Sequence, residues 1–160
     1  MQTRTVAPTV TARESHASLV AGLNEDLARE FQAIVRYTQF AASASGPFRP
    51  EIAALFRREI SDELAHAHYL ADKVVAFGGE PTTNVPMVEP VEDLHAMLEA
   101  VVASERTDVA LYTRRAQEAE KAGEVGLKVQ LENIILDETR HMEEVERILA
   151  GWTDQTGRSR

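Results

Sequence analysis

The sequence contains no cysteine. This absence excludes disulfide bonds, thiolate zinc sites and iron–sulfur clusters, and it leaves oxygen and imidazole groups as the ligands for any metal. No apolar run approaches the roughly 20 residues that span a bilayer, and the first residues, MQTRTVAPTVTARES, lack the apolar segment of a secretory signal. We therefore expect a cytoplasmic protein without a membrane partner.

Basic residues are also few, with 17 Lys and Arg against 26 Asp and Glu and a formal net charge of -9. Sequence-independent binding to nucleic acid depends on neutralising phosphates with basic side chains, so this balance disfavours a nucleic-acid partner. The length of 160 residues suits a single domain.

Apolar residues recur at helical spacing in four stretches that turn residues separate, which predicts helices over about 16–45, 51–77, 91–122 and 124–150. We predict that residues 1–14 form a flexible arm before a cap at Ser15, that 15–151 form the domain, and that 152–160 form a polar tail. The first two and the last two helices are joined by short turns, which favours two antiparallel hairpins.

The middle connection, GGEPTTNVPMVEP, has 13 residues. A segment of that length extends to roughly 40 Å, which matches a helix of about 27 residues at 1.5 Å per residue. It could therefore run the full length of the domain and leave the second and third helices parallel. The predicted fold is all-α, an antiparallel four-helix bundle of two hairpins with a long crossover.

Acidic and imidazole side chains occupy apolar positions in each predicted helix: Glu30; Glu63 and His66; Glu105; Glu138 and His141. An isolated buried carboxylate normally takes up a proton. Four of them at one level of a bundle therefore predict compensating cations, and two divalent metals would supply the charge.

An internal repeat supports this interpretation. Five pairs share one offset of 75 residues: Glu30 and Glu105, Tyr37 and Tyr112, Asp62 and Asp137, Glu63 and Glu138, and His66 and His141. Each half supplies one Glu from its first helix and a Glu-x-x-His from its second, and residues three apart share a helix face. Together the halves offer four carboxylates and two imidazoles.

This set resembles the ferritin-like superfamily of di-iron carboxylate proteins, whose bundles use this ligand pattern. The segments REFQAIVRY, SDELAHAHYL and DETRH look most like those of bacterioferritins. The resemblance implies that Glu63 and Glu138 bridge two irons, and that two Glu-His pairs complete the coordination, Glu30 with His66 and Glu105 with His141.

For the neighbouring residues, the resemblance implies that Asp62 and Asp137 orient the ligating imidazoles. Tyr37 and Tyr112 are expected either to bond to carboxylates or take part in redox steps, or to be core aromatics with satisfied hydroxyls. Glu59 could guide iron inward, although a solvated acid is the simpler interpretation.

Two departures from bacterioferritin limit the comparison. Leu64 stands where bacterioferritin has its haem-ligating Met, so haem is not expected. The tail after His141 is short and polar and leaves little room for the fifth helix of 24-subunit cages. The resemblance implies a homo-oligomer, a dimer at least.

The expected function is that of a ferroxidase, which oxidises Fe(II) with O2 or H2O2 in iron storage, detoxification or protection from oxidative stress. One alternative is a dimanganese or mixed-metal centre that disproportionates peroxide, because the same ligands accept Mn. Another is a non-enzymatic bundle that binds or delivers iron. A DNA-protecting mini-ferritin is disfavoured because the ligand set is complete within one chain.

Overall fold

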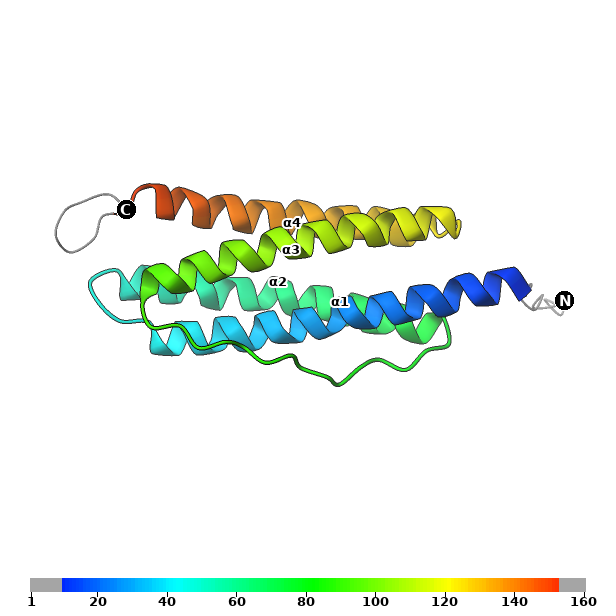
Figure 1. Cartoon of the computed structure of the whole chain (residues 1–160), viewed down its shortest axis with the longest axis horizontal. Helices are drawn as coiled ribbons and strands as arrows, with labels where there is room; N and C mark the ends of the chain where they lie inside the picture. Colours follow the sequence, from blue (N-terminus) through cyan, green and yellow to red (C-terminus); the bar gives the residue numbers. More distant parts are fainter. Residues whose placement is uncertain (1–9, 153–160) are drawn as a thin grey trace, which may run out of the picture.

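A computed structural model describes residues 10–152 and the side chains from His16 onward. This part of the chain contains four α-helices and no strand: α1 (Val10–Ser43), α2 (Arg49–Ala76), α3 (Leu94–Lys121) and α4 (Val125–Ala150). They lie side by side as a bundle (Figure 1), which confirms the predicted all-α fold. None of these helices carries an apolar stretch long enough to cross a membrane.

The bundle consists of two antiparallel hairpins, α1 with α2 and α3 with α4, and contacts between α1 and α3 help to join them. The connection between α2 and α3 runs along the bundle from one end to the other, so these two helices are parallel (Figure 1). The predicted long crossover is therefore confirmed.

All four helices begin at residues other than those predicted; α2 begins two residues earlier and α4 one residue later, and the differences at α1 and α3 are larger. Helix α1 begins at Val10, so residues 10–14 are helical and Ser15 is not its cap; the rest of the expected arm, 1–9, lies outside the described residues. Helix α3 begins at Leu94 rather than Val91, because the Asp93 carboxylate accepts the Ala96 N–H at 2.8 Å and caps the helix there.

A proline and a glycine mark the two ends of α2. Pro50 lies in the first turn of α2, where its missing N–H costs nothing, and Gly78 after α2 has a φ of +81°, which favours glycine. Trp152, expected in the polar tail, packs against Phe48 in a tilted arrangement and against His95 edge-on, at the end of the bundle. Residues 153–160 of that tail lie outside the described residues.

The apolar core has two separate parts. One surrounds Phe40, Phe56 and Leu98, and the other surrounds Leu70 and Leu127. Between them lies a level of buried polar side chains, to which all four helices contribute.

Candidate metal centre

All six predicted ligands lie in this polar level. Their side chains come from every helix, and each residue is between 1% and 6% exposed: Glu30 from α1, Glu63 and His66 from α2, Glu105 from α3, and Glu138 and His141 from α4. The carboxylates therefore occupy core positions, as the apolar pattern predicted.

The six residues form two overlapping groups, in each of which one ligand atom per residue lies within 4.8 Å of the others. The first group is Glu30, Glu63, His66 and Glu138, and the second is Glu63, Glu105, Glu138 and His141. Glu63 and Glu138 belong to both. The arrangement thus provides two adjacent cation positions with two shared carboxylates.

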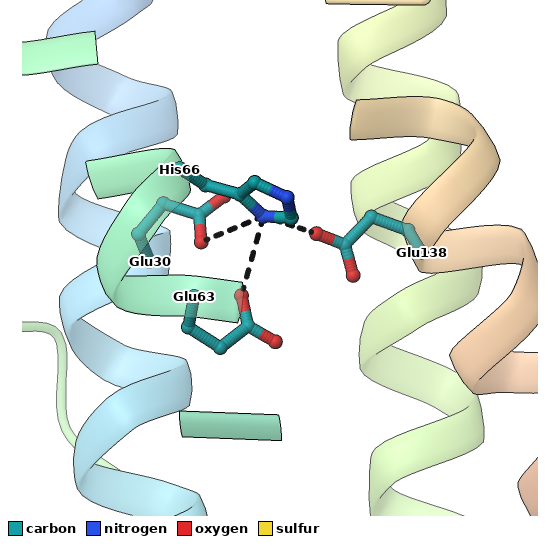
Figure 2. Close-up of side chains that lie close together, drawn as sticks. All are labelled: Glu30, Glu63, His66 and Glu138. Atoms are coloured by element: carbon teal, nitrogen blue, oxygen red, sulfur yellow. Dashed lines mark ion pairs between the residues drawn. The ribbon is translucent and has the colours of Figure 1, made fainter. Parts of the chain in front are cut away.

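The first group is drawn in Figure 2, where the His66 ring points between three carboxylates. Its Nδ1 lies 3.1 Å from Glu138 Oε1, 3.7 Å from Glu30 Oε2 and 3.8 Å from Glu63 Oε2. In the second group, His141 Nδ1 lies 3.6 Å from Glu138 Oε2. Both imidazoles therefore direct Nδ1 toward Glu138, one of the two shared carboxylates.

Buried atoms without hydrogen-bond partners test whether these residues suit a metal. Five such side-chain atoms occur among the described residues, all in this centre: Glu30 Oε2, Glu63 Oε1, His66 Nδ1, Glu138 Oε2 and His141 Nδ1. A buried polar atom left without a partner costs roughly 1–3 kcal/mol. Carboxylate oxygens and imidazole nitrogens are donors that divalent iron, manganese or zinc accepts, so the residues fit a pair of such ions.

The far side of each imidazole faces an aspartate. His141 Nε2 lies 3.3 Å from Asp62 Oδ2, and His66 Nε2 lies 3.6 Å from Asp137 Oδ2. In both cases the aspartate and the histidine come from opposite hairpins. The sequence repeat does not reveal that each histidine faces the aspartate of the other half.

The two tyrosines make the same kind of exchange. Tyr37 donates its hydroxyl to Glu105, and Tyr112 donates to Glu30; both bonds are buried. Burial and the charges of nearby carboxylates raise the pKa of both tyrosines well above the usual value. Both hydroxyls therefore stay protonated and act as donors to the carboxylates.

Protons take the place of cations when the centre holds no metal. Burial, together with neighbouring carboxylates, raises the pKa of Glu63 and Glu105 well above the usual value. Burial would raise the pKa of Glu138 too, but hydrogen bonds with Glu105 and both imidazoles lower it. Burial would lower the pKa of His141, but hydrogen bonds with Glu138 and Glu59 raise it to about 10. Metal binding must therefore displace protons.

Glu59 also belongs to this part of the core. It is only 4% exposed, and its Oε2 lies 2.8 Å from His141 Nε2, so its interpretation as a solvated acid is wrong. The residue lies four positions before Glu63 and shares its helix face. The repeat could not reveal it, because the position 75 residues later is Ile134.

A second buried polar contact, between α1 and α3, is not predictable from the sequence. Arg115 of α3 and Asp26 of α1 are 3% and 2% exposed, and Nε lies 2.8 Å from Oδ2. Gly22 leaves the space that the guanidinium occupies. The residues at the equivalent repeat positions, Val101 and Phe40, are both in the apolar core, so the two ends of the bundle are stabilised differently.

Comparison with known proteins finds a family model, the ferritin-like domain, that matches residues 20–153. A bacterioferritin of Desulfovibrio desulfuricans is 26% identical over 133 residues, which cover 82% of this chain and 74% of that protein. A crystal structure of ferritin-like, diiron-carboxylate proteins from Bacillus anthracis is 43% identical, with a TM-score of 0.82 over 84% of this chain and 96% of the other. A D. desulfuricans bacterioferritin structure, 24% identical, has the same fold, with a TM-score of 0.79 over 89% of this chain and 82% of the other.

Proposed function

Because this chain belongs to the ferritin-like domain family, we propose that its buried centre is a ferroxidase site that binds two Fe(II) ions as substrate and oxidises them with O2 or H2O2. The observation that carries the proposal is the pair of overlapping ligand groups that share Glu63 and Glu138. The unpartnered oxygen and nitrogen atoms of the same residues support it.

The proposed roles follow from the contacts. Glu63 and Glu138 bind both ions; Glu30 with His66 holds one and Glu105 with His141 holds the other. Hard carboxylate oxygens favour ferric over ferrous iron, which helps oxidation. Tyr37 holds Glu105 in place through its hydroxyl, and Tyr112 does the same for Glu30. Asp62 accepts from the outer nitrogen of His141, whereas Asp137 faces His66 at 3.6 Å without a hydrogen bond.

The electron count suits a paired site. Each Fe(II) gives up one electron, and two electrons with two protons convert H2O2 to two water molecules or O2 to one H2O2. Protons displaced from Glu63, Glu105 and the imidazoles by metal binding are available at the same place. The cellular role that we propose is iron storage, detoxification or protection from oxidative stress, in the cytoplasm and as a homo-oligomer.

Anaerobic Fe(II) titration tests the proposal. We expect two Fe(II) per chain and, when air or H2O2 is admitted, a rise in Fe(III) absorbance that Glu63→Ala and His66→Ala abolish. His68→Ala is the matched control, because His68 lies on the same helix but is exposed. Oxidation that continues unchanged in Glu63→Ala and His66→Ala would refute the proposal.

A set of carboxylate and imidazole donors without a thiolate also accepts Mn, which leaves a second candidate. A dimanganese or mixed-metal centre would disproportionate H2O2 to O2 and water. Metal analysis after expression with both metals present, followed by an O2-release assay, separates the two reactions. Metal binding with neither Fe(II) oxidation nor O2 release would instead identify a binding or delivery protein.

A further inference from the structure

The two imidazoles of the centre have different surroundings, although the repeat makes their own positions equivalent. The position that faces the outer side of His141 is Glu59, while the repeat-equivalent position, on α4, is Ile134, which is fully buried in the apolar core. The two rings therefore differ in what surrounds Nε2, the nitrogen that points away from the carboxylate cluster.

His141 has two carboxylate neighbours on its Nε2 side. Glu59 Oε2 lies at 2.8 Å and Asp62 Oδ2 at 3.3 Å. Glu59 is itself held by Arg58, whose Nη2 lies 3.2 Å from Glu59 Oε1 and 3.0 Å from Glu144 Oε1 on α4. Glu59 is therefore a buried, fixed carboxylate in contact with Nε2, beside Asp62, whose Oδ2 is hydrogen-bonded to the same nitrogen. The contact with Glu59 constrains both the tilt of the ring and the direction of Nδ1.

His66 has no comparable acceptor among the described residues. Its Nε2 lies 3.6 Å from Asp137 Oδ2, which is beyond hydrogen-bond range. That aspartate is partly exposed and is engaged by Arg140 at 2.7 Å. The His66 ring is thus oriented by packing and by the carboxylates on its Nδ1 side.

A carboxylate that accepts the outer N–H of a metal-bound imidazole fixes its orientation and makes the other nitrogen a stronger donor, and loss of such a partner typically lowers metal affinity 10- to 100-fold. We propose that Glu59 is a positioning residue that makes the two metal positions unequal, so that the position of Glu105 and His141 fills first. This inference rests on the proposed function, since it requires a two-metal centre.

Anaerobic Co(II) titration, followed by visible absorbance and calorimetry, measures the two binding steps without turnover. We expect two steps in the wild type that differ at least tenfold. Glu59→Ile, which copies the residue of the other half, should weaken the first step about 10- to 100-fold and bring the steps together. Glu59→Gln keeps the shape and a neutral acceptor, so it should weaken that step less. Glu143→Gln, an isosteric change at an exposed position of α4, should alter neither step.

Ligand-deleted backgrounds assign the steps to positions. In Glu30→Ala, where the His141 position is intact, adding Glu59→Ile should weaken Co(II) binding about 10- to 100-fold. In Glu105→Ala, where the His66 position is intact, the same addition should change the affinity less than twofold. Circular dichroism identifies any variant that does not fold, and Glu59→Gln remains as the test if Glu59→Ile is such a variant.

Several outcomes would overturn the inference. Equal steps in the wild type, or equal weakening of both steps by Glu59→Ile and by Glu59→Gln, would refute it and leave the two-metal centre standing. A third Co(II) that is lost in Glu59→Ile would make Glu59 a ligand instead of a positioning residue. Failure of the wild type to bind two Co(II) would refute the proposed function itself.

Discussion

Replacement of Gly22 by alanine is a strong test of the contact between the hairpins. A Cβ at this position of α1 would overlap the guanidinium of Arg115, which occupies the space above the glycine. Arg115 would have to leave its contacts with Asp26 at 2.8 Å and with Glu118 at 2.5 Å. Asp26, which is 2% exposed, would remain as a buried carboxylate without its partner.

The expected loss follows from two opposing effects. Removal of one partner from a buried ion pair costs about 3–5 kcal/mol, and alanine in place of glycine inside a helix returns about 1 kcal/mol. We therefore expect Gly22→Ala to lower the free energy of unfolding by about 2–4 kcal/mol. For a chain of this length that corresponds to a Tm lower by about 4–16 °C.

Urea unfolding of the metal-free protein, followed by far-ultraviolet circular dichroism at fixed protein concentration, measures the change. Gly126→Ala is the control, because a Cβ there meets no atom within 4 Å, and it should lose no stability. In an Arg115→Ala background the obstacle is gone, so Gly22→Ala should cost nothing or stabilise slightly. The reasoning is refuted if Gly22→Ala is as stable as the wild type, or costs as much without Arg115 as with it.

Two further predictions concern the centre without metal. The pKa of His141 is about 10 in the folded protein, against 6.5 ordinarily. Its contribution to stability is therefore complete below pH 6.5 and is lost as the pH rises to about 10. With a chelator present to keep the centre free of metal, the Tm should be lower at pH 9 than at pH 6, and Zn(II) should reduce that difference. A Tm that is level or rises over this range would contradict that assignment. Tyr37→Phe removes the donor to buried Glu105 and should lower the free energy of unfolding by about 1–3 kcal/mol, whereas unchanged urea unfolding would show that the bond contributes nothing.

The sequence predicts the bundle and the polar level well, for identifiable physical reasons. A Glu at an apolar position of a helical repeat, such as Glu30 or Glu105, must be buried if the helix packs at all. The length of the crossover restricts how the hairpins connect. The start of α1 was missed because residues 10–14 carry no apolar periodicity, although nothing in them prevents a helix.

The remaining features depend on how the hairpins dock. The hydrogen bonds that Tyr37 makes with Glu105 and His141 makes with Asp62 join different hairpins. No spacing within one hairpin encodes which partner each side chain meets. Glu59 has no acidic equivalent in the repeat, and Asp26 and Arg115 lie 89 residues apart with apolar equivalents. Burial of such residues could be inferred only from the packed structure.

The reciprocal bonds between the halves also describe a symmetry. Tyr37 meets Glu105 as Tyr112 meets Glu30, and His66 faces Asp137 as His141 faces Asp62. In an isologous two-fold dimer, each contact between two residues is repeated by their equivalents with the subunits exchanged. The equivalent helices α1 and α3 run antiparallel, as a two-fold axis perpendicular to the bundle requires (Figure 1). The chain is thus a pseudo-dimer closed by its crossover, and covalent linkage is what allows one half to carry Glu59 where the other carries Ile134. A dimer of identical hairpins would have to place the same residue at both positions that its two-fold axis relates.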